Sequence, residues 1–270
     1  MKNSKSKLTN ICGSMKYLTL EGKCKLKNFI DFSGEKILCV DNDSTVMDGE
    51  IVDTLAEIIG DDSAEEIAEI TNICMNGKIE ISFEESLRRR IDILVKKGLD
   101  KSHIKKCVNG LNFSEGFEDL VKKIFDVYGT VENKIFILSG GFEEVIKPKI
   151  FELNLAENEK KILTNQVFAN TFIFQGDDVI GVDFVNKEKN MWQDFAKAIR
   201  IKKLREVGLI SDSAKVLALG DGSNDVDMVG DRDEGLFVAY SGVVARGNTI
   251  EKSCGVECGD FFEAGKILFG

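Results

Sequence analysis

Two acidic side chains lie two positions apart, immediately after a short apolar run. The run Ile37–Val40 is followed by Asp41 and Asp43, and then by the hydroxyl-bearing residues Ser44 and Thr45. Carboxylates this close raise each other's pKa, and burial raises both further. The pair therefore either lies at a solvated turn or is compensated by a cation.

Two more apolar runs are followed directly by polar and glycine residues. The segment Ser139–Gly141 follows the run Ile135–Leu138, and Gly220–Asp225 follows Val216–Leu219. Each signature alone is weak, because polar residues after a strand commonly form turns or helix caps. Together they would meet the first pair at the carboxyl ends of one sheet, where open α/β sheets bind ligands. Hard oxygen ligands suit Mg²⁺, and glycine amides and hydroxyls suit anionic oxygens. The sequence thus predicts a phosphate site with a magnesium ion.

The elements that would carry these residues alternate between buried strands and helices. Four short apolar runs are typical of buried parallel strands. The pattern of residues 171–184 is typical of a small hairpin. The runs are Ile37–Val40, Ile135–Leu138, Val216–Leu219 and Leu236–Ala239. Helical stretches separate them, which favours an α/β fold with helices on both faces of the sheet.

Residues 47–115 have a different character, with no convincing strand and several helices. Ser63 and Ser82 each precede a glutamate by three positions, which fits a capping box. Gly98 is well placed to end the second of these helices. We therefore expect a helical cap over 47–115, inserted after the first strand of a core formed by 1–46 and 116–270. Residues 1–35 could add a strand or a dimer contact.

The composition narrows the class of protein. The chain has 270 residues and a net charge of −10, which argues against nucleic-acid and anionic-membrane partners. No apolar run reaches the roughly 18 residues of a membrane span, and the N-terminus resembles no secretion signal. Seven cysteines without a CxxC pair favour free thiols in a reducing cytosol. A cytoplasmic monomer or homodimer is expected, and His103 is expected at the surface.

The motifs resemble those of the haloacid-dehalogenase (HAD) superfamily of phosphatases. Asp41–Thr45 matches its DxDx(T/V) motif, Ser139 its strand-end serine, and Gly220–Asp225 its GDGxND motif. Within the superfamily the chain is most similar to the phosphoserine phosphatases, on the stretches DSTVMDGEIVDTLAEIIG (43–60), FEESLRRR (83–90), SGGF (139–142) and FAN (168–170). The resemblance covers about 36–240 and implies a Rossmann-like HAD core with a small cap.

The resemblance implies a role for each matching residue. Asp41 would be the nucleophile that forms an aspartyl-phosphate, and Asp43 the general acid and base. Mg²⁺ would be held by the Asp41 carboxylate, the Asp43 backbone carbonyl and Asp221, with Asp225 in support. The phosphoryl oxygens would be bound by Ser139, the Gly140 amide and a lysine, for which Lys197 is favoured over Lys189.

The helix expected from residue 83 indicates which arginine faces the cap interior. At about 100° per residue, Phe83 and Leu87 lie on an apolar stripe, Arg90 lies at its margin, and Arg88 and Arg89 point away. A buried guanidinium needs an anion, either a substrate carboxylate or a structural salt-bridge partner.

The resemblance implies the first of these for Arg90. It also places Glu50 at a substrate ammonium group, Met75 and Phe83 in an apolar lid, and Asn224 near the phosphate or substrate. The expected reaction is magnesium-dependent hydrolysis of L-phosphoserine to L-serine and phosphate.

Other interpretations remain open from the sequence. The same motifs serve phosphatases and phosphotransferases that act on other small phosphate esters. A phospho-acceptor signalling domain also uses a strand-end aspartate and a metal, but needs neither Asp43 nor an inserted cap. The segment Met75–Phe83 is about two residues longer than expected for the family, and 240–244 lacks the alanine-lysine-proline often found there.

Overall fold

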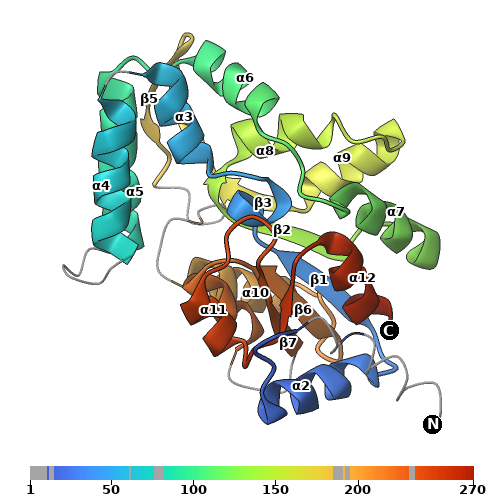
Figure 1. The fold of residues 1–270 in the computed structure, drawn as a ribbon. Coiled ribbons are helices and arrows are strands. Elements are labelled where there is room, and N and C mark those ends of the chain that lie inside the picture. The colour runs from blue at the N-terminus through green and yellow to red at the C-terminus, as the bar shows by residue number, and fades with distance from the viewer. Residues whose placement is uncertain are drawn as a thin grey trace.

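The core of the protein is a six-stranded parallel sheet (Figure 1). The structure is a computed structural model that describes residues 11, 15–60, 62–75, 82–184, 191, 195–230 and 235–270. The strand order is β3-β2-β1-β6-β7-β8. The strands are β1 (Lys36–Val40), β2 (Ile135–Phe142), β3 (Val167–Asn170), β6 (Lys215–Gly220), β7 (Gly235–Tyr240) and β8 (Glu257–Cys258). All four apolar runs are strands of this sheet, which confirms the predicted parallel α/β fold.

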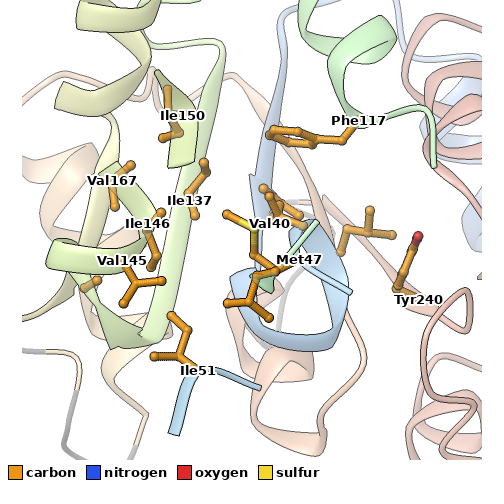
Figure 2. Packing of buried hydrophobic residues seen from close by; sticks show 14 of the residues in the cluster. Val40, Met47, Ile51, Phe117, Ile137, Val145, Ile146, Ile150, Val167 and Tyr240 are labelled. Atoms are coloured by element: carbon orange, nitrogen blue, oxygen red, sulfur yellow. The ribbon is translucent and has the colours of Figure 1, made fainter. Parts of the chain in front are cut away.

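Both faces of the sheet are covered by helices, because the side chains of each strand alternate between them. Leu38 and Val40 of β1 join one hydrophobic cluster, and Ile37 and Cys39 join a second. Figure 2 shows part of the first cluster around Val40. It is completed by α2 (Leu20–Ile30), α7 (Phe117–Tyr128), α8 (Glu143–Ile150), α9 (Glu157–Asn165) and α12 (Phe261–Phe269). The second cluster is covered by α10 (Ala196–Glu206) and α11 (Gly247–Lys252).

The strand order reverses between β1 and β6. From β1 the chain builds outward through β2 and β3, and then returns to add β6 on the other side of β1. A crevice forms at such a reversal, outside the carboxyl ends of the strands, and this is where open α/β sheets bind ligands. Asp41 directly follows β1 and Asp221 directly follows β6, so the topology itself brings these two carboxylates together.

Within the described residues, four α-helices lie between β1 and α7, in the range expected for a cap. They are α3 (Ile51–Ile59), α4 (Ser63–Met75), α5 (Phe83–Lys96) and α6 (Lys101–Gly110). Helix α5 begins at the predicted cap, where the Ser82 hydroxyl accepts a hydrogen bond from the Glu85 amide at 3.2 Å. It ends before Gly98, which has a φ of +84°, as predicted. The capping prediction for Ser63 was wrong: Ser63 is the first residue of α4, and its buried hydroxyl has no hydrogen-bond partner among the described residues.

A β-hairpin contacts the helical segment that precedes α7. As predicted for 171–184, β4 (Phe172–Gln175) pairs with β5 (Asp178–Val182) in an antiparallel hairpin. The Val179 amide donates to the Leu99 carbonyl at 2.9 Å, and the Lys101 amide donates to the Asp177 carbonyl at 3.0 Å. The hairpin is therefore bonded to the segment that joins α5 and α6.

The remaining expectations concern the N-terminal segment, the thiols and the histidine. Residues 20–30 form α2, which packs against β7 and α12. The five described cysteines are free thiols, while Cys12 and Cys74 lie outside this description. His103 is half-buried rather than on the surface, because its side chain forms a capping box with Asp100 at the start of α6. In the described ranges, no helix is both long and apolar enough to cross a membrane.

Candidate active site

The tight turn after β1 gives Asp41 and Asp43 different surroundings. Asn42–Val46 form a kinked turn, in which Asp43 has an extended backbone with a ψ of 132° and Ser44 is left-handed at a φ of +52°. The Asn42 amide donates to Oδ1 of Asp41 at 2.7 Å, and the Asn42 side-chain amide donates to Oδ1 of Asp43 at 2.7 Å. The turn thus fixes both carboxylates through one intervening residue.

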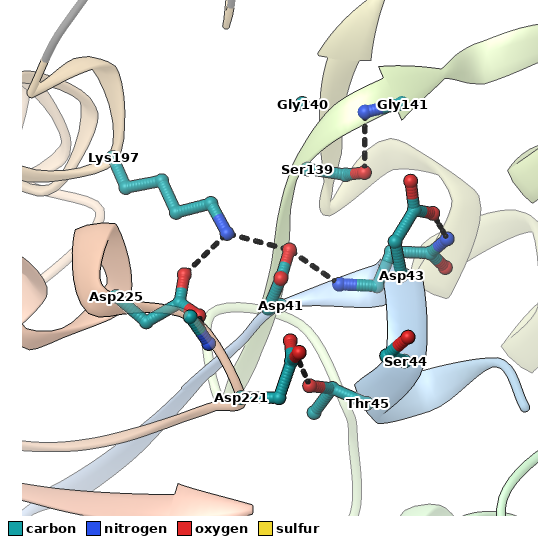
Figure 3. A network of polar contacts seen from close by, with 12 residues as sticks. Asp41, Asp43, Ser44, Thr45, Ser139, Gly140, Gly141, Lys197, Asp221 and Asp225 are labelled. Atoms are coloured by element: carbon teal, nitrogen blue, oxygen red, sulfur yellow. Dashed lines mark hydrogen bonds and ion pairs between the residues drawn. The ribbon is translucent and has the colours of Figure 1, made fainter. Parts of the chain in front are cut away.

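Three buried carboxylates meet at the strand ends. Asp41, Asp221 and Asp225 each offer a carboxylate oxygen, and these oxygens all lie within 4.8 Å of one another. Nζ of Lys197, on α10, lies 2.5 Å from Oδ1 of both Asp41 and Asp225 (Figure 3). Of the two lysines weighed from the sequence, Lys197 is therefore at the cluster, and Lys189 lies outside the described residues.

Burial and mutual repulsion set the charge of this cluster. Burial first, and then the charge of Asp225, raise the pKa of Asp41 well above its usual value. The same two causes raise the pKa of Asp221 to about 6, although Arg246 opposes the shift. Burial alone would lower the pKa of Lys197, but the carboxylates of Asp225 and Asp41 raise it overall. The site is short of positive charge, which is the condition under which carboxylates bind a divalent cation.

Asp43 is suited to carry a proton near neutral pH. Burial, followed by the negative charge of Glu50, raises the pKa of Asp43 to about 7. The hydrogen bond from Asn42 and the charge of Lys197 oppose the shift without reversing it. A general acid works best when its pKa lies near the working pH. The local environment therefore equips Asp43 for proton transfer.

The end of β2 packs closely against α5. The Ser139 hydroxyl is fully buried and accepts a hydrogen bond from the Gly141 amide at 2.8 Å. The Asn170 side-chain amide donates to the Gly140 carbonyl at 2.8 Å. A Cβ added at Gly140 would lie 2.7 Å from Cζ of Phe83. A side chain at Gly140 would therefore require the Phe83 ring of α5 to move, because the end of that ring lies against this backbone.

One cavity of about 310 Å³ gathers most of the predicted residues. Its lining includes Asp41, Asp43, Glu50, Phe83, Arg90, Gly140, Lys197, Asp221, Asn224 and Asp225. Ser139 is fully buried and is not among the lining residues. The side chain of Met75 falls outside the described part of the chain. The cavity thus joins residues that follow strands of the sheet with residues of α5 and with Glu50, which precedes α3.

The three neighbouring arginines of α5 have different partners. Arg88 pairs with Glu84 at 3.0 Å, and Arg89 pairs with Glu85 at 2.6 Å, both on the exposed side of the helix. Arg90 is half-buried and lines the cavity, where its Nε donates to the Ser86 carbonyl at 3.4 Å. Within the described ranges, Arg90 forms no ion pair. The orientation of Arg90 expected from helical spacing is confirmed. The alternative of a structural salt bridge to Arg90 is not found within the described residues.

Arg246 is a residue of the cavity that the sequence analysis missed. It precedes α11, and its Nε lies 2.6 Å from Oδ2 of Asp221 while its Nη2 lies 3.3 Å from Oε1 of Glu50. The one available signal was its place shortly after β7, next to the segment that lacks the family's alanine-lysine-proline. A single arginine in a loop has no periodicity that could mark its contacts.

Comparisons with known proteins agree with this geometry. No family model matches the chain. A phosphoserine phosphatase of Methanocaldococcus jannaschii is 30% identical over 206 residues, which cover 76% of this chain and 85% of the relative. One of Campylobacter jejuni subsp. doylei is 31% identical over 210 residues, covering 75% and 86%. A probable phosphoserine phosphatase of Schizosaccharomyces pombe is 31% identical over 218 residues, covering 80% of this chain but 65% of the relative.

Two solved structures support the same relationship. A phospho-aspartyl intermediate analogue of phosphoserine phosphatase has a TM-score of 0.62 and 28% identity, and the match covers 82% of this chain and 91% of that one. A substrate-bound phosphoserine phosphatase complex has a TM-score of 0.65 and 25% identity, covering 86% and 97%. The chain therefore belongs to the haloacid-dehalogenase superfamily of phosphatases, close to the phosphoserine phosphatases, and is a phosphoric monoester hydrolase.

Proposed function

We propose that this enzyme hydrolyses L-phosphoserine to L-serine and inorganic phosphate, with Mg²⁺ and through a phosphoryl group carried transiently by Asp41. The observation that carries the proposal is a single cavity lined by Arg90 and Glu50 as well as by Asp41 and Lys197. A substrate with a carboxylate, an ammonium and a phosphate group would find a partner of opposite charge for each. The phosphoserine phosphatases among its relatives support the same substrate.

The first step transfers the phosphoryl group to the enzyme. An oxygen of the Asp41 carboxylate bonds to phosphorus while the bond between phosphorus and the serine oxygen breaks. Asp43 donates its proton to the departing oxygen, which leaves as the hydroxyl of L-serine. A pKa of about 7 keeps a substantial fraction of Asp43 protonated at neutral pH. This step leaves Asp41 phosphorylated and Asp43 as a carboxylate.

The second step releases phosphate and restores both carboxyl groups. A water molecule attacks phosphorus, and Asp43 accepts a proton from that water as the new bond forms. The bond between phosphorus and the Asp41 oxygen breaks, so inorganic phosphate leaves and Asp41 regains its carboxylate. The proton that Asp43 gave in the first step is thereby recovered.

Ser139, the Gly140 amide and Lys197 would bind the phosphoryl oxygens. We assign the lysine to Lys197 because its Nζ lies 2.5 Å from the Asp41 oxygen that would carry the phosphoryl group. A preorganised cation and N–H donor stabilise the charge that shifts between those oxygens in the transition state. The buried hydroxyl of Ser139 would donate a hydrogen bond to the same phosphate.

The donor set fits a magnesium ion. Asp41, Asp221 and Asp225 are buried carboxylates with a shortage of positive charge around them, and hard oxygen ligands are those that Mg²⁺ prefers. Asp41, Asp221 and the backbone carbonyl of Asp43 would hold the ion, with Asp225 in support. When bound, Mg²⁺ would neutralise charge on the phosphoryl oxygens and keep Asp41 ionised.

The cap side of the cavity would select the rest of the substrate. The guanidinium of Arg90 matches a carboxylate in shape and charge, and Glu50 would accept hydrogen bonds from the ammonium group. Phe83 rests on Gly140 and would exclude water from the phosphate. Asn224 lines the same cavity and would contact the phosphate or the substrate, while Met75 is assigned to the lid by family resemblance.

The test is a steady-state assay of L-phosphoserine hydrolysis with Mg²⁺. We expect Asp41→Asn to reduce kcat by at least about a thousandfold, because the nucleophile is lost. We expect Arg90→Ala to raise KM by about tenfold or more, with a smaller effect on kcat, because one charge-assisted contact is lost. Arg89→Ala is the matched control, since Arg89 is exposed and paired with Glu85.

The two variants separate the chemistry from the substrate assignment. Wild-type kinetics in Arg90→Ala would rule out phosphoserine as the selected substrate and leave the phosphatase chemistry intact. Full turnover in Asp41→Asn would remove Asp41 as the nucleophile. An equal loss in Arg89→Ala and Arg90→Ala would indicate damage to α5 rather than loss of a substrate contact.

A further inference from the structure

Arg246 connects the two sides of the cavity. Its guanidinium donates through Nε to Oδ2 of Asp221, at 2.6 Å, and through Nη2 to Oε1 of Glu50, at 3.3 Å. Asp221 follows the core strand β6, and Glu50 immediately precedes α3, the first helix of the cap. One side chain thus holds the carboxylate expected at the metal and the carboxylate expected at the substrate ammonium.

The contacts on Glu50 leave one of its oxygens available. Oε1 accepts hydrogen bonds from the Ser44 hydroxyl at 2.8 Å and from Arg246. In the described part of the chain, Oε2 accepts none. Two donors on Oε1 restrict rotation of the carboxylate, so Oε2 is presented in a fixed direction.

We propose that Arg246 is a positioning residue for amine recognition: it holds Oε1 of Glu50 so that Oε2 meets the ammonium group of the substrate. This inference rests on the proposed function, which assigns the ammonium group to Glu50. Asp221 anchors the other end of the guanidinium, because it is nearly fully buried at the end of a central strand. The rigid core thereby fixes a specificity residue at the edge of the cap.

A guanidinium suits this role better than an ammonium group. Its planar fork offers several N–H groups in fixed directions, so one side chain can bond two carboxylates at once. Its charge also offsets the repulsion between Glu50 and Asp221, and burial strengthens that effect. The Arg246 side chain is 29% exposed, so water screens the interaction only in part.

The experiment compares two substrates that differ in the amine alone. L-Phosphoserine and the phosphate ester of 3-hydroxypropionate share the carboxylate and the phosphate, and only the first carries an ammonium group. The measured quantity is the ratio of their kcat/KM values with Mg²⁺. We expect Arg246→Ala to lower this preference for phosphoserine by about tenfold, chiefly through KM, because Glu50 loses a charged donor.

Three further variants test whether Arg246 acts through Glu50. Arg246→Lys keeps the charge but not the fork, so we expect it to restore thermal stability without restoring the preference. Glu50→Gln should itself lose the preference, and adding Arg246→Ala to it should change the ratio no further. Arg89→Ala should keep the parental ratio.

Each outcome bears on a distinct claim. An unchanged ratio in Arg246→Ala, with the parent still preferring phosphoserine, would overturn the positioning role alone. A higher preference in Arg246→Ala would also overturn it, since Arg246 would then compete with the ammonium group. Full recovery in Arg246→Lys would show that charge suffices and would likewise overturn it. A parent without any preference would overturn both this inference and the proposed substrate.

Discussion

Asp41 and Asp43 are chemically identical residues whose surroundings give them different properties. Asp41 lies beside the carboxylates of Asp221 and Asp225 and forms an ion pair with Lys197. Asp43 lies apart from that cluster, and Glu50 is its main negatively charged neighbour. The first environment favours a carboxylate bound to cations, and the second favours a group that gains and loses a proton.

The pKa of Asp43 makes a prediction about pH. Asp43 must be protonated to act as a general acid, so kcat/KM should fall as the pH rises through about 7. Glu50→Gln removes a negative charge that raises this pKa, and the fall should therefore move to lower pH. The phosphate ester of 3-hydroxypropionate is the suitable substrate, because it has no amine for Glu50 to bind.

The Asp43 prediction is checked by pH–rate profiles of the parent and of Glu50→Gln. Glu84→Gln, which changes an exposed carboxylate of α5, should leave the profile in place. A fall that stays at the same pH in Glu50→Gln would contradict the assignment of this ionisation to Asp43.

At the scale of elements, the sequence predicted what depends on local patterns. Strand ends, the hairpin and the orientation of Arg90 follow from periodicity and turn residues, and the structure agrees. Ser63 and Ser82 have the same local pattern, yet only Ser82 caps a helix. Arg246 could not be placed because its two contacts depend on how a loop after β7 meets α3. The helix start at Ser63 and the contacts of Arg246 both depend on tertiary packing, which cannot be predicted from a short stretch of sequence.

The two serines should respond oppositely to the same substitution. Ser82→Ala removes the hydroxyl that accepts from the Glu85 amide, and should lower the free energy of unfolding by about 1 kcal/mol. Ser63→Ala removes a buried hydroxyl without a partner, and should leave stability unchanged or raise it by up to about 1 kcal/mol. Urea unfolding monitored by circular dichroism measures both. Equal losses would contradict the helix starts described here.

At the scale of the molecule, the fold concentrates negative charge where its strand order reverses. The net charge of −10 is spread over the chain, but Asp41, Asp221 and Asp225 are buried together at the carboxyl ends of β1 and β6. Hydrophobic packing on both faces of the sheet must offset their repulsion. The site is therefore a source of instability in the metal-free protein, and this links metal binding to the stability of the whole fold.

That link predicts how stability depends on pH and on Mg²⁺. The folded pKa of Asp221 is about 6, above its ordinary value of 3.8, so the folded state holds this proton more tightly than the unfolded state. The stability that this proton contributes to the metal-free protein should therefore be lost as the pH rises from about 4 to about 6. At neutral pH, Mg²⁺ at a hundred times its Kd should add about 2.7 kcal/mol, or about 5–10 °C in Tm.

Asp221→Asn separates the two effects, because it removes a repelling charge and an expected metal ligand together. At neutral pH the metal-free variant should melt at a higher temperature than the parent, and Mg²⁺ should raise its Tm far less. Asp92→Asn, which changes an exposed carboxyl of α5, should behave like the parent. Differential scanning calorimetry with and without Mg²⁺ measures these shifts. If Mg²⁺ stabilised Asp221→Asn as much as the parent, Asp221 would not be a ligand, and the buried carboxylates would need another explanation.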